Sequence, residues 1–324
     1  MSKLNGDKPV LENIDYYIFA YNPKASNILR AKKWHRSFLK NLHFNQKTEV
    51  NIIENPKLIT EKIRCYSKNS KILIAIGGGD GTVSSITNQL LNDSKVCKYS
   101  NIYLLPLWGG NANDLAYMLN GLSKTTSCKK LINDSINIKM PQIKIDIESK
   151  NTLAQTFYAN CYASFGASAY IADKLESSRS SSKRFIKYFP PFLIIREVFL
   201  VIASILEATV FRMEIDSRDT NFFEHSFVNG PRMAKVSRLP ISLHEKAFFH
   251  AQIKQKSPSV IIELMKLAIS GKSSPNYKKK EKVTFIAKEP ITAQIDGEIH
   301  KIPAHTKIAV TSLETNLKYI SLAK

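Results

Sequence analysis

The first half of the chain alternates short, wholly apolar runs with amphipathic stretches. The apolar runs are "YYIFAY" at Tyr16–Tyr21, then "EVNIIE", "KILIAI" and "NIYLLPL", and each suits a buried strand. Between them, residues repeat at helical spacing, as Ile28, Trp34 and Phe38 do within Ser26–Leu42. This alternation predicts a parallel sheet covered by helices. Further helices are predicted over 56–67, 82–91 and 111–119.

The pattern changes within Pro141–Thr152, and short strand-like runs dominate from there on. Such runs, separated by turn signals, predict an antiparallel sandwich or barrel. Helices are predicted mainly near Phe192–Leu206 and Ser259–Ile269, and polar low-complexity stretches at Glu176–Arg184 and Gly271–Lys282 are predicted to be surface loops. The strand-like runs are "QIKIDIES", "TFYANCYAS", "TVFRMEID", "HSFVNGP", "KAFFHAQI", "KVTFIAK", "ITAQIDGEI" and "KIAVTSL".

Composition adds an electrostatic expectation. The 324 residues fit two domains, and 47 Lys and Arg against 27 Asp and Glu give a net charge of +20. That charge favours an anionic partner, with anionic lipid, nucleotide phosphate and nucleic acid all open. No RNP, KH, zinc-finger or helix-turn-helix signature is present, so nucleic acid is not expected. The four cysteines are dispersed without a C-x-x-C pair, which favours reduced thiols in a cytosol.

The chain shows no targeting or membrane-spanning signal. Its first residues lack the apolar stretch of a signal peptide. The most apolar region, Tyr188–Phe211, is interrupted by Arg196, Glu197 and Glu207, so its uncharged runs are too short to span a bilayer.

The sequence "GGGDGT" at Gly77–Thr82 lies between a predicted buried strand and a predicted helix. A tight turn would explain two glycines, but four in five positions also expose backbone N–H groups to a ligand. Thr82 is placed as the helix N-cap, and the positive end of the helix dipole favours an anion there. The stretch therefore predicts a phosphate cradle, of neither the P-loop nor the G-x-G-x-x-G type.

Asp80 conflicts with a bare phosphate site, because a carboxylate among phosphate-binding amides repels the ligand. A Mg²⁺ ion, bound by Asp80 directly or through water, removes the conflict, since Mg²⁺ prefers carboxylate and phosphate oxygens.

A second glycine motif, "LLPLWGGNANDLAYML", follows the next predicted strand. Asn111, Asn113 and Asp114 open a predicted helix there, and Asp114 suits its first turn electrostatically. Helix capping alone would also explain these residues. Because Asn22, Gly77–Thr82 and Trp108–Asp114 all follow strands, the three loops are expected to meet at the carboxyl edge of the sheet.

Together these motifs resemble the catalytic domain of the diacylglycerol kinases, and most closely the bacterial soluble lipid kinases of that family. The two glycine motifs, "GGGDGT" and "LPLWGGNANDLA", and three further segments follow the order of the family motifs. The further segments are "AYNPKAS", "NCYASFGASAYI" and "AQIDGEI". The resemblance implies an α/β nucleotide-binding domain over 1–147, like those of phosphofructokinases and NAD kinases, completed by 307–324. It implies an antiparallel β-sandwich lipid-substrate domain over 148–306.

The resemblance also implies a function. The expected activity is transfer of the γ-phosphoryl group of ATP, with Mg²⁺, to a lipid hydroxyl, most simply from diacylglycerol to phosphatidic acid. Glu298 is the first choice for the base and Asp146 the second, with Asp80 holding the metal. The residues implied to bind nucleotide are Asn22, Pro23, Lys24, Gly77, Gly78, Gly79, Asp80, Gly81, Thr82, Gly110, Asn111, Asn113 and Asp114.

Two departures from the family pattern leave alternatives open. Gly110-Asn111 replaces the family's Gly-Thr, and "LHEKAF" at Leu243–Phe248 stands where bacterial members carry acidic residues that hold a second Mg²⁺. A sphingosine or ceramide kinase, an NAD kinase, and a weakly catalytic membrane-binding protein on the same fold are the alternatives.

A lipid kinase has to reach a membrane, and one stretch pairs basic with aromatic residues as membrane interfaces favour. A core helix that follows a solvated loop is the favoured interpretation of this stretch, and membrane contact is the alternative. The expected location is cytoplasmic and peripheral at an anionic membrane. The predicted contact residues are Lys183, Arg184, Phe185, Lys187, Tyr188 and Phe189.

Overall fold

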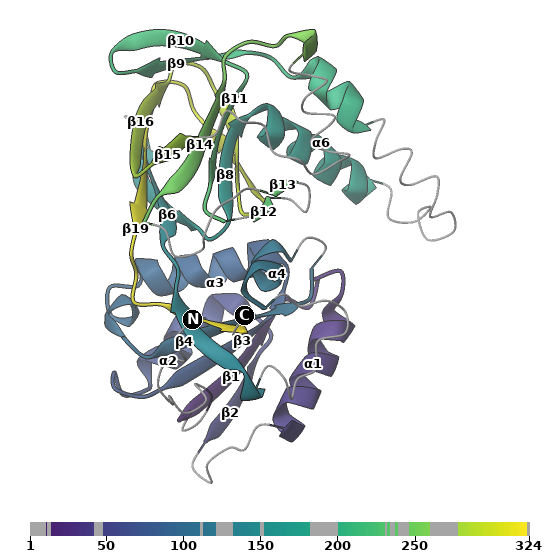
Figure 1. The fold of residues 1–324 in the computed structure, drawn as a ribbon, viewed down its shortest axis with the longest axis vertical. Helices are drawn as coiled ribbons and strands as arrows, with labels where there is room; N and C mark the ends of the chain where they lie inside the picture. The colour runs from purple at the N-terminus through teal and green to yellow at the C-terminus, as the bar shows by residue number, and fades with distance from the viewer. Residues whose placement is uncertain are drawn as a thin grey trace, which may run out of the picture. The chain divides into compact units, whose positions relative to one another are not determined.

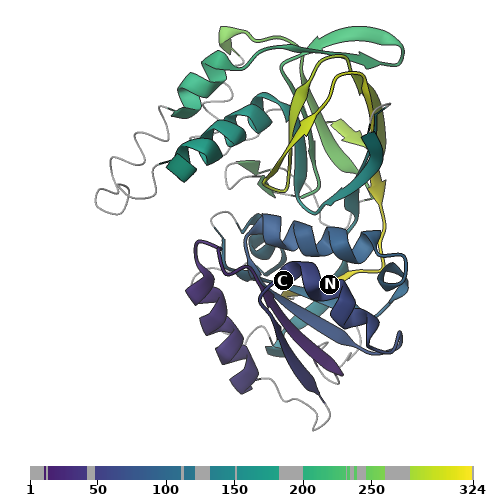
Figure 2. The same cartoon turned by 180° about the vertical axis from the view of Figure 1, so that it is seen from behind.

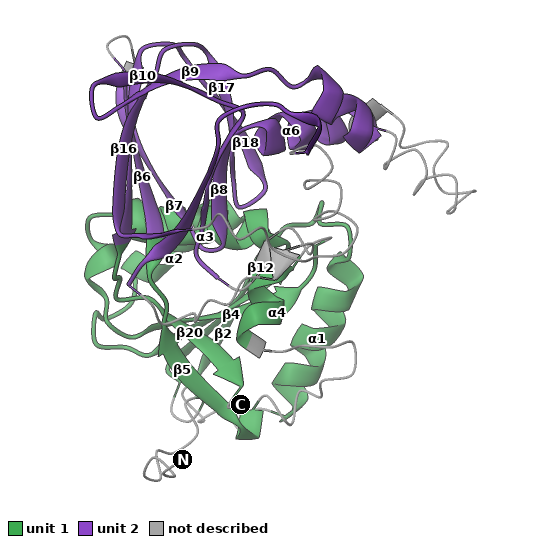
Figure 3. Ribbon diagram, turned by 45° about the horizontal axis from the view of Figure 1, so that its top comes forward, with its two compact units in different colours: residues 1–142, 242–245, 313–324 green, residues 143–241, 246–312 purple. Residues whose placement is uncertain are grey.

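The computed structural model divides the chain into two compact units (Figure 1; Figure 3). Unit 1 comprises residues 1–142, 242–245 and 313–324, and unit 2 comprises 143–241 and 246–312. The residues described are 11, 14–41, 48–110, 113–120, 132–149, 152–181, 200–230, 232–233, 237–238, 246–259 and 278–322.

Unit 1 is built on a six-stranded sheet of order β2-β1-β3-β4-β20-β5. All neighbouring strands are parallel except β20 and β5. The central strands β1, β3 and β4 are the apolar runs predicted from the sequence, because both faces of a parallel sheet are covered. The strands are β1 (Tyr16–Tyr21), β2 (Glu49–Ile53), β3 (Ile72–Gly78), β4 (Ile102–Trp108), β5 (Ser135–Lys139) and β20 (Lys318–Leu322).

Helices lie on both faces of this sheet (Figures 1 and 2). Helix α1 packs Ala31 and Phe38 against Tyr17, Phe19 and Leu73 of one face. The helices are α1 (Ile28–Asn41), α2 (Ile59–Arg64), α3 (Asp80–Asn92) and α4 (Asp114–Asn120), with short 3-10 turns η1 (Pro56–Leu58) and η2 (Val96–Lys98). The predicted α/β architecture is confirmed.

Unit 2 is an antiparallel β-sandwich of two six-stranded sheets, as predicted. The orders are β10-β9-β16-β19-β6-β7 and β15-β14-β11-β8-β17-β18. Phe165 and Phe285, one from each sheet, meet edge to face at 5.3 Å and form part of the shared core. The strands are β6 (Gln142–Ser149), β7 (Thr152–Ala159), β8 (Tyr162–Gly166), β9 (Phe211–Ile215), β10 (Arg218–Phe222), β11 (Glu224–Val228), β14 (Phe248–Ile253), β15 (Lys278–Lys280), β16 (Lys282–Ala287), β17 (Ile291–Ile295), β18 (Glu298–Ile302) and β19 (Thr306–Leu313).

Smaller elements complete unit 2. Strands β12 (Arg232–Met233) and β13 (Ser237–Arg238) pair with each other, helix α6 spans Ala167–Ser181, and a further helical segment covers 200–207. Where the structure describes helices, none is long and apolar enough to cross a membrane. Cys65, Cys97 and Cys161 are free thiols.

Several sequence expectations require correction. The run "TFYANCYAS" is two strands, because the chain turns at Asn160 and Cys161. The part of Glu176–Arg184 up to Ser181 is helical, since α6 continues through it, and the end of Gly271–Lys282 forms β15 and begins β16. The C-terminal segment expected to complete unit 1 divides: Lys307–Ser312 lies in β19 of unit 2, and β20 lies in the unit 1 sheet.

Candidate functional site

Three loops of unit 1 meet at the carboxyl edge of its sheet, as expected from the sequence. The Asn22 N–H donates to the Gly77 carbonyl (3.0 Å), and the Gly109 N–H donates to the Gly78 carbonyl (3.1 Å). Asn27 joins the first loop to the third, since its N–H donates to Gly109 O (3.0 Å) and its Nδ2 to Gly110 O (3.1 Å). The structure therefore brings together the three glycine- and asparagine-bearing segments of the predicted site.

The glycines allow these loops to touch backbone to backbone. A Cβ atom placed on Gly110 would lie 2.2 Å from Gly79 Cα, and one on Gly109 would lie 2.6 Å from Gly78 N. A Cβ on Gly77 would lie 2.9 Å from Tyr21 Cβ. Close packing within the protein thus requires glycine at Gly77, Gly109 and Gly110, whatever ligand binds nearby.

The glycine loop is shorter than predicted. Gly77 and Gly78 still belong to β3 and pair with β4, so the turn proper begins at Gly79. Helix α3 starts at Asp80 with Gly79 as its N-cap, and that cap supplies no side-chain acceptor. Thr82 is therefore inside the first turn, where its N–H donates to Gly79 O (3.0 Å), and its prediction as the N-cap is wrong.

Asp80 connects the two glycine motifs. Its side chain is buried, and its carboxylate oxygens accept the backbone N–H groups of Asp114 (3.0 Å) and Leu115 (3.1 Å). These amides begin helix α4, so a carboxylate from α3 caps α4 and favours its positive end. This contact between the motifs is a structural role that sequence reasoning missed.

Asn113 gives the second loop its shape. It adopts a positive φ of 56°, a conformation that asparagine tolerates better than most residues. Its Oδ1 accepts from Gly110 N (2.8 Å) and Gly109 N (3.2 Å), and its Nδ2 donates to Gly110 O (2.6 Å). Asp114 follows in the first turn of α4, as predicted, and is fully buried.

The opening loop presents a cation at the same edge. Asn22 Oδ1 accepts the Lys24 N–H (2.9 Å), which forms a compact turn and leaves Pro23 and Lys24 exposed. Beside it, the Arg30 guanidinium lies over the Trp108 ring at 4.7 Å. No motif flagged Asn27 or Arg30, and only the fold brings them to this edge.

In unit 2, the "DGE" sequence forms the turn between β17 and β18, with φ of 45° at Asp296 and 93° at Gly297. Asp296 is fully buried, and its carboxylate accepts the backbone N–H groups of Asn160 (2.5 Å), Cys161 (2.8 Å) and Tyr162 (3.0 Å). Burial raises the pKa of the Asp296 carboxyl, while these amide donors act in the opposite direction. The turn is thereby anchored to the β7–β8 connection.

The two predicted bases differ in their surroundings. Glu298 is exposed at the start of β18, two residues after the anchored Asp296. Asp146 on β6 is partly buried, and its oxygens contact Lys144 Nζ (2.8 Å) and Thr156 Oγ1 (2.7 Å). Asp146 is thus committed to local contacts.

Some predicted residues lie outside the described part of the chain. These are Asn111, Leu243–Glu245 of the "LHEKAF" stretch and the proposed membrane contacts Lys183, Arg184, Phe185, Lys187, Tyr188 and Phe189. Within the described ranges, no three His, Cys, Asp or Glu side chains gather as a metal-binding group.

Comparisons with known proteins agree with this geometry. The family described as the diacylglycerol kinase catalytic domain matches residues 16–143. A diacylglycerol kinase structure from Bacillus anthracis str. Sterne superimposes with a TM-score of 0.62 at 13% identity, covering 95% of this chain and 97% of that one. Yeast NADH kinase complexed with NADH superimposes with a TM-score of 0.53 at 10% identity, covering 96% and 84%. At these identities the structures establish a shared fold. No curated protein sequence matches the chain significantly.

Proposed function

We propose that the protein is an ATP-dependent lipid kinase, because residues 16–143 match the family model of the diacylglycerol kinase catalytic domain. It transfers the γ-phosphoryl group to a lipid hydroxyl, with diacylglycerol as the acceptor and phosphatidic acid as the product. The observation that carries the proposal is the closed contact between the two glycine motifs, held by Asp80 at the start of α4.

The nucleotide phosphates are proposed to lie over the first turn of α3. This helix has 13 residues, and its Gly79 N-cap offers no side chain to its first N–H groups. Those amides and the positive end of the dipole favour an anion. Lys24 adds a cation from the opening loop. The proposed nucleotide-binding set is Asn22, Pro23, Lys24, Gly77, Gly78, Gly79, Asp80, Gly81, Thr82, Gly110, Asn111, Asn113 and Asp114.

Asp80 suits an outer contact to Mg²⁺. Its two oxygens accept the amide N–H groups of Asp114 and Leu115. An ionised carboxylate has about four lone-pair sites, so it can accept several hydrogen bonds at once, including one from water. Mg²⁺ in nucleotide sites commonly keeps several waters and uses few carboxylates, so a dedicated cage of protein ligands is not required. When bound, the ion neutralises charge that develops on the transferring phosphoryl group.

Glu298 is the proposed base that accepts the proton of the lipid hydroxyl, with Asp146 as the second candidate. A base needs an accessible oxygen within hydrogen-bond reach of the proton. The exposure of Glu298 supports it, and the contacts of Asp146 with Lys144 and Thr156 weigh against Asp146. Asp296 is proposed to position Glu298 by fixing the turn that carries it.

The proposal is tested by phosphatidic acid formation and ATP consumption in mixed detergent–lipid micelles. Glu298→Gln should lower kcat by about 100-fold or more, the usual contribution of an acid–base group. Asp80→Ala should also lower kcat, because the proposed contact to Mg²⁺ is lost. Asp146→Asn should act more weakly than Glu298→Gln. Because Asp80→Ala also removes a helix cap worth about 1 kcal/mol, thermal unfolding of each variant separates a misfolded enzyme from an inactive one. Folded variants with wild-type rates would refute the site.

The acceptor is identified in the same assay with a panel of diacylglycerol, ceramide, sphingosine and NAD. Diacylglycerol should give the highest kcat/KM, and preference for NAD would place the protein with the NAD kinases instead. A peripheral, cytoplasmic location at anionic membranes is part of the proposal. Flotation with vesicles that contain or lack anionic lipid tests it, and a protein that ignores anionic vesicles would contradict it.

A further inference from the structure

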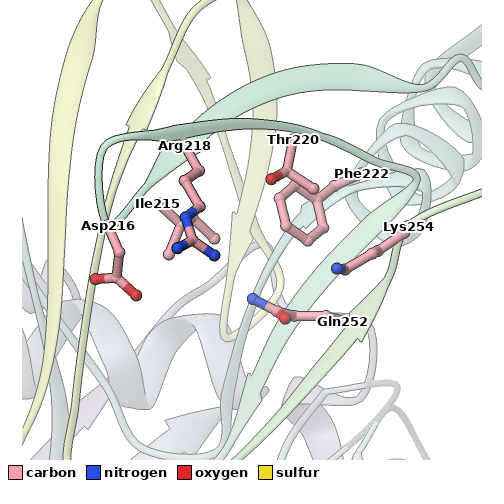
Figure 4. A pocket seen from close by; sticks show the side chains of 7 residues that line it. All are labelled: Ile215, Asp216, Arg218, Thr220, Phe222, Gln252 and Lys254. Carbon is pink, nitrogen blue, oxygen red and sulfur yellow. The ribbon is translucent and has the colours of Figure 1, made fainter.

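A pocket of about 350 Å³ opens in unit 2, and no residue of the candidate kinase site lines it (Figure 4). Arg218, Thr220 and Phe222 contribute from β10 of one sheet, and Gln252 from β14 of the other, followed by Lys254. Alternate residues of a strand point to the same face, so the three β10 side chains share one wall. The pocket lies between the edge strand β10 of one sheet and β14, the second strand of the other sheet.

Four hydrogen-bond donors line this space. In Figure 4 the Arg218 guanidinium, the Lys254 ammonium and the Gln252 amide nitrogen all point toward its middle, and Thr220 adds a hydroxyl. Asp216, in the β9–β10 turn, contributes the one carboxylate of the lining and points away from the middle. Two cations therefore face one carboxylate, and the lining carries a net positive charge.

Among the described residues, the side chains of Arg218 and Lys254 are not paired with a carboxylate, whereas two neighbouring cations are. Arg212 on β9 pairs with Glu289 (2.6 Å), and Lys288 pairs with Glu214 of the same strand. Within the part of the chain that the structure describes, the side chains of Arg218 and Lys254 form no hydrogen bond or ion pair. The neighbouring cations Arg212 and Lys288 are thus neutralised by carboxylates, whereas the side chains of Arg218 and Lys254 in the pocket are not.

The inner wall of the pocket is apolar and fixed. Phe222 is fully buried, and the His225 ring stacks on it at 5.4 Å. Gln252 Nε2 lies 3.4 Å from His225 Nε2, so the Gln252 side chain is held at one end of the buried histidine. Sites for small ligands usually combine rigid apolar side chains with a few polar groups that fix the orientation of the ligand, and this pocket has both.

We propose that this pocket binds a phosphate monoester. Arg offers a planar fork that matches phosphate oxygens, and Lys supplies a point charge. A monoester carries nearly two negative charges at neutral pH, which matches the two cations. A pocket of this volume also leaves room for the organic group beyond the phosphate, against Phe222. The site is independent of the proposed kinase reaction, since it shares no residue with it.

Titration calorimetry with glycerol 3-phosphate and with inorganic phosphate, at constant ionic strength, tests the proposal. Arg218→Gln and Lys254→Gln should each weaken binding by about tenfold, since hydrogen bonds to charged groups contribute about that factor. Arg212→Gln, on the paired strand β9, and Lys282→Gln, at the exposed first residue of β16, remove the same charge outside the pocket, and both variants should bind as the wild type does.

Vesicles containing phosphatidic acid distinguish a lipid headgroup from a free monoester. Flotation that depends on Arg218 without binding of the soluble probes would assign the site to a lipid phosphate. Binding of glycerol 3-phosphate would assign it to a free monoester. The proposal is overturned if Arg218→Gln and Lys254→Gln leave all probes bound as before. It is also overturned if Lys282→Gln weakens binding as much as they do, because general attraction to a chain of net charge +20 would then explain the binding.

Discussion

Single buried carboxylates hold distant segments of this protein together. Asp80 binds the first amides of α4, 34 residues later in the chain, and Asp296 binds the amides at Asn160, 136 residues earlier. Both belong to motifs that suggest chemistry, and both have a structural role that spacing along the sequence does not reveal. A substitution at either position therefore changes the backbone around the site as well as its charge.

Glu224 leads to a prediction about pH. Glu224 is the first residue of β11 and its side chain is buried against the start of α6. Its Oε2 accepts the Ser168 N–H (2.8 Å), and its Oε1 has no hydrogen-bond partner. Burial raises its pKa to about 7 from 4.5. Between pH 4.5 and about 7 the folded state keeps the Glu224 proton, whereas the unfolded state releases it. The unfolding free energy contributed by Glu224 is therefore lost as the pH rises through this range.

Glu224→Gln should remove that loss. Relative to the wild type, the variant should gain up to about 3 kcal/mol of unfolding free energy between pH 5 and pH 8, by the conversion of pKa shift to energy. Urea unfolding at the two pH values measures it. Glu281→Gln, at an exposed position, is the control. An equal response of both variants to pH would contradict the assignment.

At the scale of elements, the sequence predicted the central strands of unit 1 well and the contacts between elements poorly. Strands β1, β3 and β4 are continuous apolar runs, and burial on both faces leaves that signature. The β10 sequence "RDTNF" is mostly polar and was missed, because it lies at a sheet edge with four of its residues partly or fully exposed. The site loops were located, but Asn27, Arg30 and the Asp80–α4 contact depend on tertiary packing, and no local pattern encodes them.

Gly110→Ala tests the contact between the two glycine loops. Its Cβ would overlap the backbone of Gly79, so the loops must separate, at a cost of about 1–3 kcal/mol for overpacking. Separation weakens the hold of Asp80 on α4, and the Asp114 and Leu115 amides should then exchange faster with deuterium. Gly297→Ala has open space around its Cβ and alters only a strained turn in unit 2, so those amides should keep their protection. Unchanged exchange in Gly110→Ala would show that the loops are not coupled.

The pairing of β11 with β14 brings His225 and His250 together in the sandwich. Their Nε2 atoms are hydrogen-bonded, and Phe227 and Phe285 surround the His225 ring. Burial lowers the pKa of His250 to about 4, helped by Lys280, and holds the pKa of His225 well below its usual value. Below pH 6.5 the two histidines bind protons in the unfolded chain but stay neutral in the folded one. The contribution of this pair to the unfolding free energy therefore falls as the pH drops below 6.5.

We therefore expect the contribution of this pair to the unfolding free energy to decrease as the pH falls from 7 to 5, by about 2 kcal/mol for His250 alone, while the contribution of Glu224 changes in the opposite direction over the same range. The double variant His225→Leu, His250→Leu should flatten this dependence, since buried polar pairs are often replaceable by apolar ones. His305→Asn, at an exposed turn, should keep the wild-type slope. Chemical unfolding across this range gives the slopes, and a double variant with the full acid loss would exclude the pair as its cause.

At the scale of the whole molecule, unit 1 is discontinuous in sequence, because unit 2 is inserted between its segments. Unit 1 begins the chain, unit 2 interrupts it, and the last residues return as β20 between β4 and β5. Tyr319 and Ile320 of this strand are fully buried in the unit 1 sheet. The sheet is consequently incomplete until β20 has been synthesised, and β5 has no partner strand other than β20 in the described sheet.

Unit 1 should therefore not fold from residues 1–142 alone but should fold when β20 is restored. In the sheet, Lys139 lies opposite Lys318 and the two strands are antiparallel, so Met140 and Leu317 can be joined by an Asn-Gly turn to make a hairpin. A chain of residues 1–140, Asn-Gly and 317–324 should show a cooperative thermal transition and dispersed amide resonances. The matched control carries Tyr319→Asp and Ile320→Asp, which place charges in the core of the sheet. If the control or the bare fragment unfolds as cooperatively as the joined chain, the return of β20 is dispensable for unit 1.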